Sequence, residues 1–173
     1  GWYRRRGLEL IFQNGPASTR LFCEVYEALD PGCCVLAIHP ASNRVAGSCF
    51  FHPRDTHVSL GIMNVHPEFF GLGIASQLLQ YVIEQAERLT LPIRLVSSAM
   101  NLDSFSLYNR AGFVPRSVYQ DMLIAVPANG LSWRPKWMDR VRNAELADVR
   151  QLVELEMAVN QIFQRGEDLY VIW

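Results

Sequence analysis

The feature that most constrains the fold is one long amphipathic helix that begins just after a glycine-containing junction. Residues 71–89 place their apolar side chains on a single helical stripe, which consists of Ile74, Leu78, Leu79, Val82 and Ile83. A stripe of this period is typical of a helix that buries one face against a sheet or a second helix. The sequence therefore predicts a helix over 71–89 with one packed face.

Apolar runs with strand character stand on both sides of this helix. Three of them precede it and two follow it, at residues 33–39, 44–51, 56–65, 92–100 and 113–125. Short turns join the first three runs, so these strands are expected to be antiparallel. Helices are also expected over 17–29 and over 103–111, where Gly112 takes the C-terminal cap position. This alternation of helices and strands predicts an α/β domain.

Composition and charge exclude several classes of protein. Hydrophobic residues make up 50% of the 173 residues and charged residues 19%, a balance that excludes a disordered chain. The formal net charge of -1 gives no global positive field that would hold a nucleic acid. No apolar run approaches the roughly 20 residues of a membrane-spanning helix, and no signal-peptide core follows the N-terminus. We expect a cytoplasmic protein with no nucleic-acid and no membrane partner.

The chain is long enough for one well-buried domain and an appendage. We predict a core over residues 1–126, a linker over 127–137 that is rich in Pro, Gly, Asn and Ser, and a further segment over 138–173. A strand over 139–144 and a helix over 144–161 are expected in that last segment. Both elements need a partner sheet.

A short internal similarity suggests how the last segment is used. Residues 6–11 resemble residues 165–170, although a chance match of two short segments is the alternative. If the similarity is a repeat, residues 138–173 complete the sheet or start a second repeat. The completion would take place within the chain or by exchange with a second copy, as in a homodimer.

The junction before the long helix has the properties of an anion site. Gly71 and Gly73 lie between the end of a predicted strand and the first helical turn. The N–H groups of a first helical turn lack intrahelical acceptors, the helix dipole is positive there, and glycine lets a ligand approach the main chain closely. The G-x-G pattern alone is weak, because it is neither a P-loop nor a full dinucleotide fingerprint.

The surrounding residues make the pattern more specific. Val65 and Pro67 precede the glycines, and Tyr108 is followed four residues later by Gly112 and Phe113. Over about residues 17–125 the sequence resembles the GNAT superfamily of acyl-CoA-dependent N-acetyltransferases. The resemblance implies a GNAT-like mixed, mostly antiparallel central sheet flanked by helices. It also implies acetyl-CoA as the cosubstrate, and the four cysteines have no zinc-type spacing, so no metal is expected.

The resemblance assigns roles to individual residues. The backbone N–H groups that would bind the pyrophosphate of acetyl-CoA are those of Gly71, Leu72, Gly73, Ile74 and Ala75. The main-chain groups that would pair with the pantetheine arm are those of Met63, Asn64 and Val65. Asn101 matches an asparagine that touches cofactor or substrate, Arg110 would reach a phosphate, and Tyr108 would protonate the departing thiolate as general acid. The alternatives are a core Tyr108, a helix-capping Asn101 and a solvated Arg110.

Two departures from the family pattern stand out. Phe70 occupies the position of the usual Gln or Arg, and Leu72 a position where a basic residue is frequent, so charge assistance to the pyrophosphate is missing. The strand over 56–65 lacks the carboxylate that often serves as general base. His57 would deprotonate an amine through water, or it is a solvent-exposed histidine at a turn, and His66 is expected to be structural.

These observations predict an N-acetyltransferase that moves an acetyl group from acetyl-CoA to a primary amine of a small molecule or peptide by direct attack. The alternative is a non-catalytic GNAT-like lobe that binds acyl-CoA or serves as a structural or interaction module. Phe70 and the missing carboxylate favour this alternative.

Overall fold

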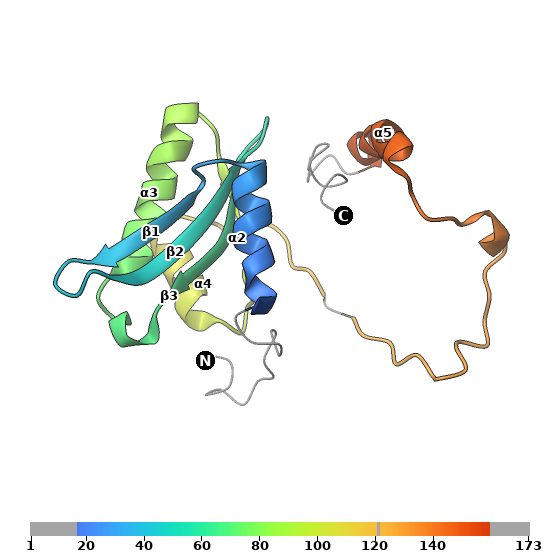
Figure 1. Cartoon of the computed structure of the whole chain (residues 1–173), viewed down its shortest axis with the longest axis horizontal. Coiled ribbons are helices and arrows are strands. Elements are labelled where there is room, and N and C mark those ends of the chain that lie inside the picture. Colours follow the sequence, from blue (N-terminus) through green and yellow to red (C-terminus); the bar gives the residue numbers. More distant parts are fainter. Residues whose placement is uncertain (1–16, 121, 160–173) are drawn as a thin grey trace.

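A computed structural model describes residues 17–120 and 122–159 of the 173-residue chain (Figure 1). The two similar segments at 6–11 and 165–170 lie outside these residues. None of the helices within them is long and apolar enough to cross a bilayer.

In the described part of the chain, four strands form a single mixed sheet in the order β1-β2-β3-β4. Their bounds are Cys34–His39 for β1, Arg44–Pro53 for β2, Val58–Val65 for β3 and Ile93–Arg94 for β4. The first two pairs are antiparallel and the pair of β3 with β4 is parallel, so the predicted mixed, mostly antiparallel sheet is confirmed. The tight turns after His39 and Pro53 allow the antiparallel pairs, whereas a parallel pair needs a crossover, which α3 supplies.

Helices cover both faces of the sheet. Their bounds are Ala17–Leu29 for α2, Ile74–Leu89 for α3 and Leu102–Arg110 for α4. Successive residues of a strand point to opposite faces. Cys49 and Phe51 of β2 pack into the core with α3, whereas the ring of Tyr26 on α2 contacts Phe50 and His52. The helices α2 and α3 therefore lie on opposite faces (Figure 1).

The core sits between the sheet and α3. The largest fully buried side chains are Leu79, Val58, Val82 and Cys49. Leu79 and Val82 belong to the stripe that the sequence predicts as the packed face of the long helix. A glycine of β2 brings α3 close, because a Cβ on Gly47 would lie 2.8 Å from the carbonyl oxygen of Asn64 and 2.9 Å from Cγ2 of Ile74.

The strand β3 has a bulge opposite β2, close to the point where its pairing with β4 ends. Cys49 pairs with Met63 and Phe51 with Leu60, so two residues of β3, Gly61 and Ile62, lie opposite the single residue Phe50. β4 pairs with β3 only at the two positions before the bulge, 58 with 93 and 59 with 94. From residue 60 to 65, β3 has no second strand beside it among the described residues. We call residues 60–65 the unpaired edge of β3.

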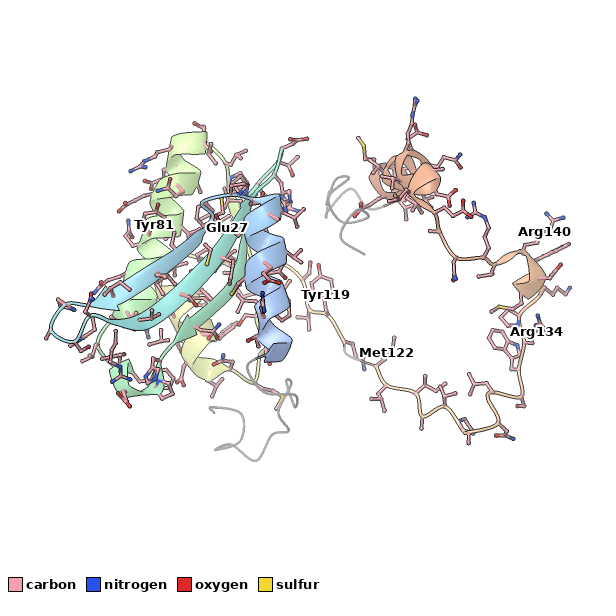
Figure 2. The ribbon with its side chains drawn as sticks, viewed as in Figure 1. Glu27, Tyr81, Tyr119, Met122, Arg134 and Arg140 are labelled. Carbon is pink, nitrogen blue, oxygen red and sulfur yellow. The ribbon has the colours of Figure 1, made fainter. Side chains whose placement is uncertain are left out.

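Two predicted strands are absent or shorter than expected. The structure has no strand in the described part of 113–125, where Val118 and Leu123 are 96% and 95% exposed. Tyr119 and Met122 lie on a segment that leaves the core (Figure 2). The predicted strand over 92–100 shortens to Ile93–Arg94. The cause is the same in both, since an apolar run becomes a strand only where a neighbouring strand supplies hydrogen bonds.

The segment after the predicted linker also differs from expectation. The predicted strand over 139–144 is wrong, because Met138–Arg140 forms the 3-10 helix η2 and residues 141–144 have no regular structure. A short 3-10 turn η3, Leu146–Asp148, then leads into the helix α5, Val149–Val159, inside the predicted range of 144–161. Arg142 fixes this start by pairing with Asp148 at 2.7 Å and 2.8 Å, while Asp148 accepts from the Glu145 N–H.

The packing predicts how a cavity in the core affects stability. Leu79→Ala removes a side chain that is 1% exposed, and we expect a loss of about 2–5 kcal/mol in the free energy of unfolding. Gln80→Ala changes the exposed neighbour on the same helix and serves as control, with an expected change within about 0.5 kcal/mol. Urea unfolding followed by circular dichroism measures both, and equal losses would contradict this account of the core.

Candidate functional site

The junction between β3 and α3 has the backbone that its two glycines allow. β3 ends at Val65, the 3-10 helix η1 covers Pro67–Phe69, and α3 begins at Ile74. Gly71 has a φ of 83° and Gly73 a φ of 76°, both in the left-handed region, which glycine adopts without steric cost. A Cβ added at either glycine would meet nothing within 4 Å, so the main chain is open to a ligand on that side.

The first turn of α3 presents free N–H groups. Gly73 is the N-cap and makes no side-chain cap, and the first helical bond runs from the Gln77 N–H to the Gly73 carbonyl at 3.1 Å. The N–H groups of residues 74–76 have no acceptor among the described residues, whereas the Leu72 N–H faces the Phe69 carbonyl at 3.4 Å. Free donors at the positive end of a helix fit an anion such as a pyrophosphate.

Aromatic packing anchors the loop before these donors. Phe69 is 7% exposed, and its ring stacks on the ring of His39 with centroids 4.8 Å apart. The side chain of His66 accepts a hydrogen bond from the Glu68 N–H at 3.3 Å and so begins η1. His66 thus caps η1, in agreement with the structural role that the sequence predicts for it.

Charge assistance is missing at the junction. The side chains of Phe70 and Leu72 are 46% and 56% exposed and take the positions where the family pattern has polar or basic residues. Arg44 lies close by, but its guanidinium donates to Glu68 at 2.6 Å, and this hydrogen bond holds the pKa of the Glu68 carboxyl below its usual value. Binding of an anion here therefore depends on backbone donors.

The predicted pantetheine residues lie on the unpaired edge of β3. On one side Met63, Asn64 and Val65 pair with residues 49, 48 and 47 of β2. On the other side no strand faces them among the residues that the structure describes. Their main chain can therefore accept an extended ligand arm in the manner of an added strand.

Tyr108 lies on the α3 face of the sheet. It is half-buried, packs against the core cluster and contacts Phe113 at 5.8 Å between ring centroids. Burial, and then the nearby Cys49, raise the pKa of its phenol above the usual value of 10.0. The phenol therefore keeps its proton at neutral pH, as a proton donor must.

The other two polar candidates sit on α4. Asn101 is the N-cap of this helix, and its side chain accepts from the Ser104 N–H at 3.3 Å, which is the capping alternative. Arg110 is exposed in the last turn. Neither position argues by itself for a ligand.

His57 is buried rather than exposed, so the solvent-exposed alternative is wrong. It is 5% exposed directly before β3, and its Nδ1 lies 3.0 Å from the Thr56 hydroxyl. Burial, followed by the charges of Arg94 and Arg54, lowers the pKa of its imidazole.

The structure also brings together three residues that the sequence analysis missed. His52, 8% exposed, has its Nδ1 at 2.6 Å from Oδ2 of Asp30, and Arg54 donates to Oδ1 of the same carboxylate at 2.9 Å. Asp30 directly follows α2, and His52 lies 22 residues later, next to the last residue of β2. The only signal in the sequence is the strand alternation, which puts Phe50 and His52 on the same face of the sheet.

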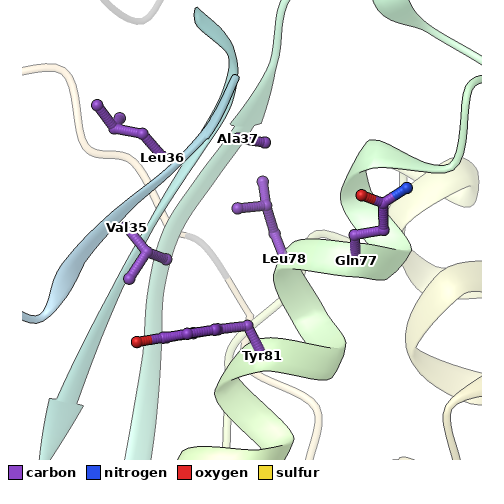
Figure 3. Close-up of a pocket in the computed structure, with 6 residues that line it drawn as sticks. All are labelled: Val35, Leu36, Ala37, Gln77, Leu78 and Tyr81. Carbon is purple, nitrogen blue, oxygen red and sulfur yellow. The ribbon is translucent and has the colours of Figure 1, made fainter. Parts of the chain in front are cut away.

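A pocket of about 390 Å³ lies elsewhere, between β1 and α3 (Figure 3). Its lining residues are Val35, Leu36, Ala37, Gln77, Leu78 and Tyr81. The lining is mostly apolar and brings no cluster of titratable groups together. Within the described ranges, no group of three metal-ligating side chains occurs either.

Comparison with known proteins gives the family. The model of the acetyltransferase (GNAT) family matches residues 2–113, which is more than half of the chain. The chain therefore belongs to the GNAT family of acetyltransferases. No curated protein matches the chain.

Solved structures agree on the fold. A chain described as an acetyltransferase from Pyrococcus horikoshii superposes with a TM-score of 0.53 and 21% identity over 61% of this chain and 36% of that one. A probable acetyltransferase gives 0.52 and 22% over 73% and 86%. A chain of the NatC complex bound to Gag peptide and CoA gives 0.50 and 21% over 56% and 66%. At such identities the likeness establishes the fold.

The junction makes a prediction about ligand binding. Gly73→Ala places a Cβ in the open space before α3, and we expect acetyl-CoA to bind at least about tenfold more weakly, or ~1.4 kcal/mol. Gly130→Ala is the matched control, because Gly130 has a φ of 80° and equally open surroundings in the predicted linker. Calorimetric titration measures both, and equal affinities for the two variants would argue against a site at the junction.

Proposed function

We propose that the chain is an N-acetyltransferase that moves an acetyl group from acetyl-CoA to a primary amine of a small molecule or peptide. One observation carries the proposal: in a member of the GNAT family, two left-handed glycines leave the first-turn N–H groups of α3 open beside the unpaired edge of β3. This is the arrangement that a pyrophosphate followed by an extended amide-bearing arm requires.

The residues fit acetyl-CoA as substrate. The N–H groups over residues 71–75 would hold the pyrophosphate, with those of Ile74 and Ala75 the most open, and the main chain over residues 63–65 would hold the pantetheine arm. Acetyl-CoA supplies an activated acyl carbonyl. The protein holds this carbonyl beside an amine, and such positioning replaces a bimolecular encounter with an effectively unimolecular step.

Tyr108 is proposed as the proton donor to the departing thiolate. Its raised pKa keeps the phenol protonated at neutral pH, and its packing against Phe113 holds the ring in place. Asn101 and Arg110 are proposed as further contacts to the substrate, Asn101 in addition to its role as a helix cap.

A peptide is supported as the acceptor by one structural neighbour. The NatC complex, which shares the fold, was solved with a Gag peptide and CoA. For this chain a peptide amine is therefore the first acceptor class to test, together with small primary amines. The cytoplasm stays the predicted location.

The second candidate is a non-catalytic lobe that binds acyl-CoA or serves as an interaction module. Phe70, Leu72 and the absence of a carboxylate on β3 favour it. Transfer of acetyl groups to a panel of peptides and amines separates the two functions, because a lobe binds acetyl-CoA without turning it over.

The role of Tyr108 predicts a loss of turnover. Tyr108→Phe removes the proton donor but keeps the ring, and we expect kcat to fall about 100-fold with unchanged affinity for acetyl-CoA. Tyr81→Phe, on α3 and 43% exposed, is the control and should keep full activity. The release of CoA under saturating acceptor gives both rates. Wild-type turnover in Tyr108→Phe would remove the tyrosine from the mechanism.

We also propose that residues 138–173 complete the fold or start a second repeat, within the chain or by exchange with a second copy. Since no strand forms over 139–144, the described element that is available for this is α5. β1 supports the proposal, because it is an edge strand among the described residues, Leu36 and Ile38 on it are 55% and 46% exposed, and exposed edge strands are commonly covered by a further element. Leu155 and Met157 of α5 are also more than half exposed.

Truncation tests this proposal. We expect a chain that ends at residue 135 to lose self-association or folding stability, because the apolar edge of β1 would stay uncovered. Sedimentation velocity across a concentration series, with urea unfolding of both chains, measures the two effects. A truncated chain with unchanged stability and association state would contradict the proposal.

A further inference from the structure

We propose that His52 is the general base of this acetyltransferase and that Asp30 is its positioning residue, an inference that rests on the proposed function. The strand β3 carries no carboxylate that could serve as a base, and the sequence analysis offers only His57 for that role. The pair lies on the α2 face of the sheet, opposite the face that holds Tyr108.

The hydrogen bond fixes the form of the imidazole. The Nδ1 of His52 lies 2.6 Å from Oδ2 of Asp30, and an ionised carboxylate can only accept. Nδ1 therefore carries the hydrogen, and in the neutral ring the lone pair is on Nε2. A histidine held in this way by a carboxylate is the arrangement that serves as a base in nucleophilic catalysis.

Neighbouring groups keep the carboxylate ionised and the ring in place. Arg54 donates to both oxygens of Asp30, at 2.9 Å and 3.3 Å. Burial alone would raise the pKa of the Asp30 carboxyl, but the hydrogen bonds from Arg54 and His52 outweigh it and hold the pKa below its usual value. The ring of Tyr26 lies edge-on against the His52 ring, with centroids 4.8 Å apart.

The free nitrogen points to the bulge of β3. A Cβ built on Gly61 would lie 3.1 Å from Nε2 of His52, so the imidazole occupies the space that a side chain at this position would need. Gly61 lies in the bulge, at the point where β3 leaves β4. Nε2 thus reaches the start of the unpaired edge, two residues before Met63.

Nε2 is also accessible. Its ring makes one hydrogen bond to the described residues, through Nδ1. No buried side-chain nitrogen or oxygen in the described part of the chain lacks a partner, so Nε2 is not sealed from solvent. A water or an amine can therefore contact this nitrogen, although the residue as a whole is only 8% exposed.

His57, the other histidine of this region, is less well placed to act as the base. His57 lies four residues before Gly61, roughly 13 Å along an extended strand. Its Nδ1 contacts the Thr56 hydroxyl, and burial, followed by the charges of Arg94 and Arg54, lowers the pKa of its imidazole. It has no carboxylate to orient it among the contacts that the structure describes.

The proposed step is a direct transfer of the acetyl group from sulfur to nitrogen. An amine that is protonated at neutral pH must lose a proton before its lone pair can attack. His52 takes this proton at Nε2, directly or through one water, the N–C bond to the acetyl carbonyl carbon forms and the C–S bond breaks. The thiolate receives a proton from the Tyr108 hydroxyl, and the attacking nitrogen loses its second proton, through water, to the tyrosinate. The ammonium and acetyl-CoA thus give an acetamide, CoA and one proton, which His52 holds and then releases to solvent. The two proton-transfer groups act from opposite faces at the unpaired edge of β3.

The test compares wild type, His52→Gln, Asp30→Asn and His57→Gln. For His52→Gln we expect kcat to fall about 100-fold, an unchanged affinity for acetyl-CoA by calorimetry, and loss of the acid limb of the pH profile. Asp30→Asn should lower kcat without a change in the KM for acetyl-CoA, and it should remove the preference of His52 for the form with its hydrogen on Nδ1, an effect that a merely structural role would not produce. His57→Gln tests the base that the sequence analysis named, and loss of the acid limb in this variant but not in His52→Gln would overturn the assignment to His52. Rates come from CoA release with a panel of N-terminally free peptides and small amines.

A second measurement needs no acceptor. Imidazole ¹⁵N shifts of the wild-type protein should show the hydrogen of neutral His52 on Nδ1 and the lone pair on Nε2, which decides the case if His52→Gln does not fold. A hydrogen on Nε2, or an unchanged acid limb in His52→Gln, would overturn the assignment. If acetyl-CoA binds and no acceptor is turned over, the proposed transferase function fails, and the assignment of a base to it fails as a consequence. The ¹⁵N shifts then report only the tautomer.

Discussion

The loss of pairing between β3 and β4 at the bulge is the constraint on which the site depends. Gly61 and Ile62 share one partner, Phe50, and β4 stays beside β3 only before that point. The remaining backbone groups of β3 then face no strand among the described residues. Backbone groups left in this state need partners from solvent or from a ligand. The same bulge places Gly61 under the His52 imidazole, so one irregularity serves both the predicted substrate arm and the proposed base.

The junction before α3 shows how binding can persist without charged side chains. Its donors are backbone N–H groups, whose positions are set by two left-handed glycines and by the burial of Phe69. The nearby Arg44 is already paired with Glu68. Exchange of the usual polar residues for Phe70 and Leu72 therefore removes long-range attraction but leaves the donors in place. The arrangement is consistent with the family of the chain and compatible with either of the two candidate functions.

Local pattern predicted the elements whose partners are close in sequence. The helix over 17–29 and the three strands before α3 form nearly as expected, because each has a strong period and a short turn to its neighbour. The apolar run over 113–125 has the same character but no neighbouring strand among the described residues, and period alone cannot supply one. The contact between Asp30 and His52 joins two elements and residues that are 22 positions apart in the sequence, and no spacing rule predicts it. The glycine junction was found because its chemistry is local.

Amide chemical-shift mapping with acetyl-CoA tests the central claim most directly. We expect that titration with acetyl-CoA shifts the amide resonances of residues 71–75 and 63–65, while those of the pocket between β1 and α3, at Val35 and Leu36, stay in place. Saturable shifts confined to the junction and the unpaired edge would support the site. Shifts at the β1 pocket alone, or none at millimolar acetyl-CoA, would contradict it and leave a chain with the family fold and no ligand at the junction.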